Sequence, residues 1–286
     1  MESKSSKNRP FFILILPGIL ICAFTILYFP VGKQLIKSWA ESEQNSHGFL
    51  IIPICFYIFW IKWNDLKKIP ILPSIWGLVI VVFSLLLYIF SKYAAILTLT
   101  SFSLVPLIIG TVIYLYGFKI FKHLSFPLFF LFFMIPVPAQ IYAALTIHLQ
   151  LFISEISSGI AALFGIPVYR NGNIIHLPDR ILQVVQACSG MRSMISLLAL
   201  SAVFGYLSLK STFLRTILFL FGIPVAILVN IIRVFLTIIF FHYFKFDLTQ
   251  GSVHTFFGIL IFIFAFIFLA AIRGILFKWD KTSKQN

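Results

Sequence analysis

Residues 214–241 read LRTILFLFGIPVAILVNIIRVFLTIIFF, a run in which Arg215, Asn230 and Arg233 are the only charged or amide side chains. About 20 apolar residues, rising 1.5 Å each along a helix, cross the hydrocarbon core of a bilayer. The run therefore predicts a transmembrane helix. Because an ionisable group inside a span is costly without a partner or a role, Arg233 is also the first candidate functional residue.

The same length criterion predicts further spans on both sides of this run. The candidates are 11–29, 49–63, 74–91, 97–117, 126–141, 188–208 and 254–277, of which 49–63 and 126–141 are short. The segment 142–166 is apolar and amphipathic, which is typical of a helix that lies at the membrane interface or dips into the bilayer. The expected fold is an all-α polytopic membrane protein with about eight transmembrane helices.

The composition favours a membrane protein throughout the chain. Of the 286 residues 60% are hydrophobic and only 10% are charged, whereas a soluble domain has about 25% charged residues. We therefore expect a single membrane domain over 1–286, with a core at 11–277 and short tails at 1–10 and 278–286. The net charge of +14 lies mainly between apolar runs, which predicts contact with membrane lipids and excludes nucleic acid as a partner.

The positions of the basic residues predict the orientation. With a cytoplasmic N-terminus, 14 of the 22 Lys and Arg residues fall on the cytoplasmic side, as the positive-inside rule requires, and both termini are cytoplasmic. These residues are Lys4, Lys7, Arg9, Lys62, Lys67, Lys68, Lys119, Lys122, Lys210, Arg215, Arg273, Lys278, Lys281 and Lys284.

The loop 167–187 differs from the other loops. It contains Asn171-Gly172 between short runs with β propensity, which predicts a small β-hairpin. The orientation places this hairpin outside the cytoplasm, directly before Cys188, and we interpret Arg170, Asp179 and Arg180 as solvated charges of the hairpin.

Cys188 is the candidate nucleophile. It opens an apolar run, where the positive end of a helix dipole would favour the thiolate, and Arg192 four residues on would share its face. The alternative is a small buried cysteine with Ser189 as helix cap and Arg192 reaching the lipid head groups. The spacing of Cys22, Cys55 and Cys188 predicts neither a disulfide framework nor a metal site, and we expect no cofactor.

Three further polar residues lie within or beside spans. Asn230, three residues before Arg233, lies on the same helix face and could orient it; the alternative for Arg233 is a phosphate contact or a salt bridge between helices. His254 and His47 each precede an apolar run, where a histidine serves either as a general acid or base or merely as a polar helix end.

Helix length relates these candidates to one membrane face. The intervals Cys188–Lys210, Arg215–Arg233 and His254–Arg273 each correspond to roughly 27–33 Å of helix, close to the hydrocarbon thickness. Cys188, Arg233 and His254 are therefore expected near the outer interface, and His47 on the same side, beside the hairpin.

These residues occur in strings that resemble the exosortase/archaeosortase family. The strings, in order between about residues 40 and 275, are Ser46-His47-Gly48-Phe49, Gly165-Ile166-Pro167-Val168, Ala187-Cys188-Ser189-Gly190-Met191-Arg192-Ser193, Asn230-Ile231-Ile232-Arg233 and Gly251-Ser252-Val253-His254. The string around Cys188 is the most specific of them.

The resemblance implies a membrane cysteine transpeptidase or protease of the hydrolase class, with Cys188 as nucleophile, Arg233 as oxyanion or substrate-positioning group and His254 as acid/base. Arg192, Asn230, His47 and Ser189 would support or bind the substrate. The implied substrates are exported proteins with a C-terminal tail of a short motif such as Pro-Glu-Pro, one transmembrane helix and a basic cluster. An amine or glycan-linked acceptor and a bacterial inner membrane follow from the same resemblance.

Two other functions remain open from the residues alone. A transporter, or a protein that handles lipid or polysaccharide, would use Arg233 and Arg192 to bind an anionic group. A scaffold for polysaccharide export would need none of the three candidate catalytic side chains.

Overall fold

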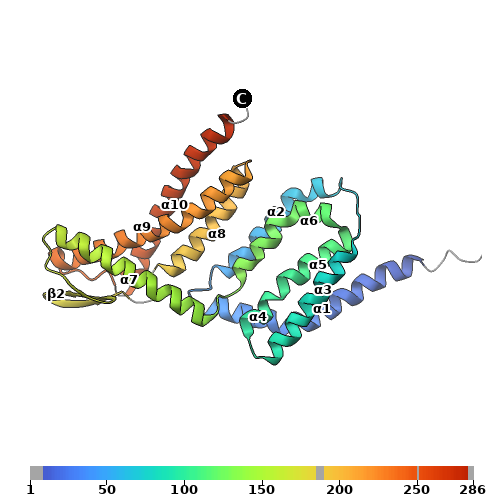
Figure 1. The fold of residues 1–286 in the computed structure, drawn as a ribbon, viewed down its shortest axis with the longest axis horizontal. Coiled ribbons are helices and arrows are strands. Elements are labelled where there is room, and N and C mark those ends of the chain that lie inside the picture. The colour runs from blue at the N-terminus through green and yellow to red at the C-terminus, as the bar shows by residue number, and fades with distance from the viewer. Residues whose placement is uncertain (1–8, 185–189, 250, 283–286) are drawn as a thin grey trace, which may run out of the picture. The chain divides into compact units, whose positions relative to one another are not determined.

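The computed structural model describes residues 9–184, 190–249 and 251–282, and in these the chain is mainly helical with one small sheet (Figure 1). The chain divides into two compact units, Met1–Pro136 (unit 1) and Val137–Asn286 (unit 2). Each unit has its own set of buried residues. The single membrane domain over 1–286 stays a prediction.

Unit 1 is built from helices only in its described part. In chain order they are α1 Arg9–Glu41, α2 Gly48–Leu66, α3 Ile75–Tyr93, α4 Leu97–Phe102, α5 Leu104–Tyr116, α6 Phe118–Phe130 and the 3-10 segment η1 Leu131–Met134.

The helices α3 and α5 cross where each has a glycine. A Cβ added at Gly77 would lie 2.2 Å from the amide nitrogen of Tyr114, and one added at Gly110 would lie 2.9 Å from the Gly77 carbonyl oxygen. The two backbones can approach this closely only because both side chains are absent, as in other small-residue contacts between membrane helices.

Polar side chains connect α1 to the rest of unit 1. The Tyr28 and Ser103 hydroxyls are 2.9 Å apart, the Tyr88 hydroxyl donates to the Leu27 carbonyl, and Trp39 Nε1 donates to the Met134 carbonyl. Each bond satisfies a polar group that would otherwise be costly in an apolar interior.

Unit 2 combines helices with the sheet. Its elements are α7 Ala139–Leu163, β1 Tyr169–Asn171, β2 Ile174–Leu177, β3 Arg180–Gln183, α8 Met191–Ser208, α9 Thr212–Phe244 and α10 Gly251–Thr282. The helices α8, α9 and α10 pack along one another around a core that includes Leu197, Leu218 and Ala265.

The sheet confirms the predicted hairpin and adds a third strand. The strands are antiparallel in the order β1-β2-β3, with Tyr169 opposite His176 and His176 opposite Ile181. Gly172 takes the positive φ of 63° in the first tight turn, which glycine adopts at little cost. Ile175 and Leu177 pack against α7 and α9 and so attach the sheet to the helices.

Seven helices of the described residues are long and apolar enough to cross a membrane, which together with the sheet confirms a polytopic helical membrane protein with a small hairpin. They are Gly48–Leu66, Ile75–Tyr93, Leu97–Tyr116, Ala139–Leu163, Met191–Ser208, Thr212–Phe244 and Gly251–Asp280. The predicted first span, 11–29, lies inside α1.

The predicted span 126–141 is wrong. The helix α6 ends at Phe130, η1 ends at Met134, and α7 begins only at Ala139. Pro136 and Pro138 interrupt the run, because proline disfavours a helical conformation of the residue before it and lacks an amide hydrogen. The helix that follows, α7, covers most of the segment 142–166 and meets the length and composition of a span.

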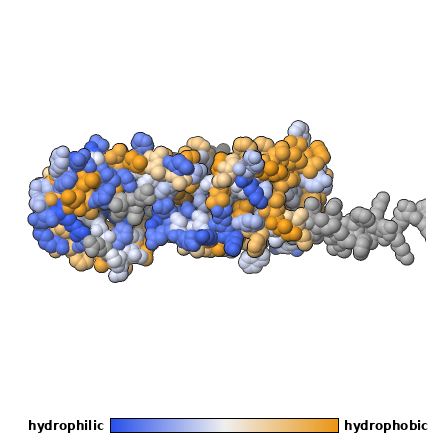
Figure 2. Space-filling model, turned by 90° about the horizontal axis from the view of Figure 1, so that it is seen from below, coloured by the Kyte–Doolittle hydropathy of each residue, from blue (hydrophilic) through white to orange (hydrophobic). Residues whose placement is uncertain are grey.

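Hydrophilic and hydrophobic residues are unevenly distributed over the surface. In Figure 2 hydrophilic residues gather at the end of unit 2 that carries the sheet, whereas hydrophobic residues cover much of unit 1. Arg233 of α9 and His254 of α10 line one cavity with residues at the end of the sheet.

Candidate active site

The structure brings Arg233 and His254 together. Arg233 lies on α9 and His254 in the first turn of α10, and Arg233 Nη2 is 3.1 Å from His254 Nε2 and 3.4 Å from Nδ1. Both side chains are partly buried. Two residues that were predicted only to share a membrane face are thus direct neighbours within unit 2.

The contact places a fixed cation beside the His254 ring. A guanidinium has only N–H donors and stays charged, and Arg233 Nη2 lies at similar distances from both ring nitrogens of His254. An imidazole can exchange a proton during a reaction, and a neighbouring cation can bind a developing negative charge.

Neighbouring residues leave room for the Arg233 side chain. A Cβ added at Gly258, one helical turn after His254, would lie 3.7 Å from Arg233 Nη2. Thr237 donates its hydroxyl to the Arg233 carbonyl at 2.9 Å. The guanidinium therefore passes over a glycine of α10 to reach the histidine.

A small cavity adjoins the pair. Four parts of unit 2 contribute its walls: the end of the sheet, α9, the α9–α10 loop and the first turn of α10. The lining residues are Leu182, Gln183, Val184, Arg233, Val234, Thr237, Leu248, Thr249 and His254. The sheet predicted to lie beside the candidate residues thus borders the Arg233–His254 pair.

An ion pair fastens the sheet to the α9–α10 loop. Arg180 Nη2 of β3 is 2.5 Å from Asp247 Oδ2, and the Arg180 guanidinium also lies over the Phe241 ring. Asp247 Oδ1 accepts from the amide and the hydroxyl of Thr249, at 2.8 and 2.6 Å. The loop that leads into His254 is thereby held against the strand.

Neighbouring charges and hydrogen bonds lower the pKa of the Asp247 and Asp179 carboxyl groups. Burial raises the pKa of Asp247, but the Thr249 hydrogen bonds and the Arg180 charge outweigh it and hold the pKa below 3.8. The hydrogen bond and charge of Lys245 lower the pKa of the exposed Asp179. Both carboxylates are therefore ionised at neutral pH.

The interpretation of Arg180 as a solvated charge is wrong. Its side chain is 33% exposed, and that of Asp247 only 20%. The two residues are 67 positions apart, so no local sequence pattern indicates the pair. Arg170, also predicted to be solvated, lies 3.7 Å from Glu155 of α7 and donates to the Gly172 carbonyl.

Asn230 packs against the start of α8. It is 3% exposed, and a Cβ added at Gly190 would lie 2.7 Å from Asn230 Nδ2. Gly190 has a left-handed backbone, φ 76° and ψ 0°, and α8 begins after it at Met191. Asn230 therefore connects the helix of Arg233 to the segment that carries the predicted nucleophile.

In the described residues this helix begins at Met191, directly after the left-handed Gly190. Arg192 is partly buried in the first turn of α8, and its predicted relation to Cys188 stays a prediction. Cys188 and Ser189 themselves lie outside the described residues.

His47 belongs to unit 1 and precedes α2. Its Nε2 lies 3.1 Å from the Phe133 carbonyl oxygen, to which it donates. Burial lowers the pKa of His47 from 6.5, although the hydrogen bonds to backbone carbonyls act in the opposite direction. His47 is therefore a neutral histidine that joins the start of α2 to η1.

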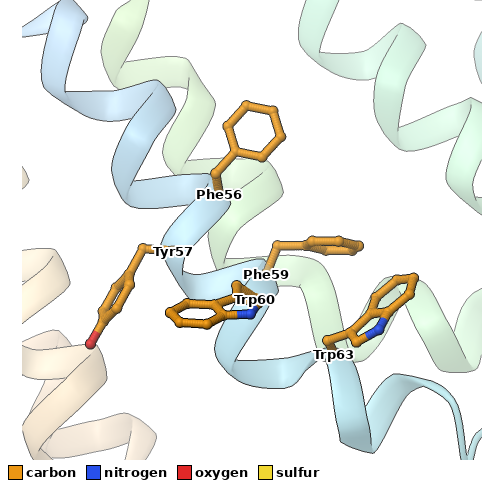
Figure 3. Close-up of a pocket in the computed structure, with 5 residues that line it drawn as sticks. All are labelled: Phe56, Tyr57, Phe59, Trp60 and Trp63. Atoms are coloured by element: carbon orange, nitrogen blue, oxygen red, sulfur yellow. The ribbon is translucent and has the colours of Figure 1, made fainter.

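In residues 9–184, 190–249 and 251–282 no three His, Cys, Asp or Glu side chains are grouped as metal ligands. A surface hollow on α2 is lined by aromatic side chains alone, which point away from the helix in several directions (Figure 3). These residues are Phe56, Tyr57, Phe59, Trp60 and Trp63.

Comparison with known proteins identifies a family. A family model described as transmembrane exosortase matches residues 39–271. No curated protein and no solved structure matches the chain. The matched range includes Cys188, Arg233 and His254.

Proposed function

The chain belongs to the transmembrane exosortase family, and from this premise we propose that it is a cysteine transpeptidase that acts on exported proteins. It cleaves their C-terminal sorting tail and transfers the new C-terminus to an amine or glycan-linked acceptor, or to water. The substrates are proteins whose tail consists of a short motif, one transmembrane helix and a basic cluster. The contact between Arg233 and His254 is the observation that carries the proposal.

The proposed reaction assigns one role to each residue. The Cys188 thiolate attacks the scissile carbonyl carbon, and Arg233 donates to the resulting oxyanion. The carbon–nitrogen bond then breaks, and His254, protonated as Cys188 becomes the thiolate, gives its proton to the leaving amine. The acceptor amine, or water, attacks the thioester, returns a proton to His254 and releases Cys188.

The contact between Arg233 and His254 supports this order of steps. It places an imidazole beside a cation, so that His254 can take the thiol proton before the attack and Arg233 can donate to the oxyanion. The close pairing of Asn230 with Gly190 supports the same site, because it joins α9 to the chain two residues after Cys188. We assign Arg192, Ser189 and His47 supporting roles in substrate binding.

We place the site on the extracytoplasmic side of a bacterial inner membrane, with both termini cytoplasmic. Arg215 lies in the first turn of α9, before Arg233, and Arg273 lies on α10 after His254. The intervals of 18 and 19 residues correspond to about 27–29 Å of helix. Helices of that length, with Arg215 and Arg273 on the cytoplasmic side, follow the positive-inside rule.

Processing in cells tests the proposal. A secreted reporter carries the tail of a protein from the same genome that ends in a motif, an apolar helix and a basic cluster. Its electrophoretic size is compared in cells with the wild-type chain, Cys188→Ala, and the matched controls Cys22→Ala and Cys55→Ala. We expect the uncleaved precursor to accumulate only with Cys188→Ala, at normal levels of the membrane protein.

The same assay separates the alternatives. A transporter or lipid-handling protein that binds an anion through Arg233 and Arg192 would tolerate Cys188→Ala but not Arg233→Ala. An assembly scaffold would tolerate alanine at Cys188, Arg233 and His254 alike. Either pattern overturns the transpeptidase proposal.

A further inference from the structure

The strand β3 forms one edge of the sheet. It pairs with β2 alone, with Ile175 opposite Leu182 and His176 opposite Ile181. The pairing continues beyond the strand, where the Val184 amide donates to the Asn173 carbonyl at 2.9 Å. This bond fixes which residues of β3 turn their backbone groups toward β2.

Hydrogen bonding alternates along an antiparallel pair. Since Val184 bonds to β2, Leu182 and Arg180 do so as well, and the amides and carbonyls of Ile181 and Gln183 point away from the sheet. Within the part of the chain that the structure describes, no hydrogen bond reaches these outward groups. The side chains of both residues are exposed, that of Ile181 by 61%.

The open edge leads to the candidate active site. Gln183 lines the same cavity as Arg233 and His254. The α9–α10 loop, which also lines this cavity, is held to β3 by the Arg180–Asp247 ion pair. A peptide that lies along β3 would therefore have one end beside the Arg233–His254 pair.

We propose that β3 binds the substrate by strand addition: an extended segment of the sorting tail pairs with the outward backbone groups of Ile181 and Gln183. This proposal rests on the proposed function and specifies how the substrate is recognised. An extended peptide is the ligand whose main chain repeats donors and acceptors at the spacing of a strand edge.

Strand addition has a consequence for selectivity. Backbone pairing is independent of sequence, whereas alternate side chains of an added strand lie on one face of the sheet. On one face here, Ile181 is in register with His176 and Tyr169, and the Tyr169 side chain is 68% exposed. The side chains of Ile181, His176 and Tyr169 on this face contact every second side chain of the bound segment.

Proline substitution tests the outward amides. Ile181→Pro and Gln183→Pro each remove one outward N–H and leave the β2–β3 hydrogen bonds intact, because proline is tolerated at the free side of an edge strand. The matched variants Ile181→Ala and Gln183→Ala change the side chain and keep the N–H. The probe is a synthetic peptide of the reporter's tail, and the proteins are full-length chains in lipid nanodiscs.

We expect each proline variant to raise KM for the peptide by roughly tenfold relative to its matched alanine variant, with kcat changed little. Proline variants that match the alanine variants would overturn the proposal. If Cys188→Ala still cleaves the peptide, the proposed function fails instead, so the two failures are distinguishable.

A second measurement does not depend on how well the proline variants fold. N-methylation of single peptide amides in the tail peptide removes one donor at a time while the wild-type chain is used throughout. We expect cleavage to fall at alternate positions of the motif, because only every second amide faces β3. Equal effects at all positions, or none, would overturn strand addition.

Discussion

Arg233 Nη2 lies 3.1 Å from His254 Nε2, although the two residues belong to different helices and are separated by the α9–α10 loop. The guanidinium has only N–H donors and stays charged, so the contact places a fixed cation beside the His254 ring. A base and a cation are thereby held beside a cavity that the sheet borders.

We predict that Arg233→Ala and His254→Gln each abolish most processing of the tailed reporter. The expected reduction is about 10²–10³-fold for Arg233→Ala, which removes a donor to the oxyanion, and about 10²–10⁴-fold for His254→Gln, which keeps an acceptor but cannot transfer a proton. Reporter cleavage rates in isolated membranes measure both.

His148→Gln serves as the control, since His148 is exposed on α7. We expect its rate to match the wild type. A His254→Gln variant that cleaves at the rate of the control would remove His254 from the reaction.

Gly190 is predicted to be intolerant of a side chain. Gly190→Ala places a Cβ against Asn230 and forces a residue other than glycine into φ 76°. The left-handed conformation alone costs about 1–2 kcal/mol. We expect a lower midpoint of thermal unfolding in detergent and a loss of processing.

Gly159→Ala is the matched control. No atom lies within 4 Å of a Cβ added at this helical position of α7, so alanine should stabilise the helix by about 0.5–1 kcal/mol. Equal midpoints for the two variants would contradict the role assigned to Gly190.

The ion pair between Arg180 and Asp247 is predicted to stabilise unit 2 over a defined pH range. The folded pKa of Asp247 is lower than its ordinary value, so its contribution is present above pH 3.8 and is lost as the pH falls through the lower, folded pKa. We expect Asp247→Asn to lower the free energy of unfolding by about 1 kcal/mol.

Thermal unfolding of wild type and Asp247→Asn between pH 3 and pH 8 measures this. The difference in midpoint should be constant from pH 5 to pH 8 and shrink below pH 4. A difference that disappears between pH 5 and pH 7 would show that another group controls the effect.

The helices and the hairpin could be predicted because their signals are local. A run such as 214–241 is apolar over more than the bilayer thickness, and Asn171-Gly172 specifies a tight turn by itself. The wrong prediction of a span at 126–141 has a local cause as well. The residues on both sides of Pro136 and Pro138 are apolar, so hydropathy alone does not show that the helix ends there.

The lateral arrangement of the site could not be predicted. Helix length places Arg233 and His254 at one depth, but the direction in which each side chain points depends on how α9 packs on α10. The Arg180–Asp247 pair and the fit of Asn230 against Gly190 join segments 67 and 40 residues apart. These contacts depend on tertiary packing, which hydrophobic periodicity does not encode.

The acyl-enzyme on Cys188 is the central claim, and a nucleophile that captures it provides the most direct measurement. Membranes with a chain whose only cysteine is Cys188, made by Cys22→Ala and Cys55→Ala, process the tailed reporter in the presence of hydroxylamine, which attacks thioesters. The predicted result is a released reporter whose mass shows a C-terminal hydroxamate, and no release with Cys188→Ala. Release at an undiminished rate by Cys188→Ala would contradict the account.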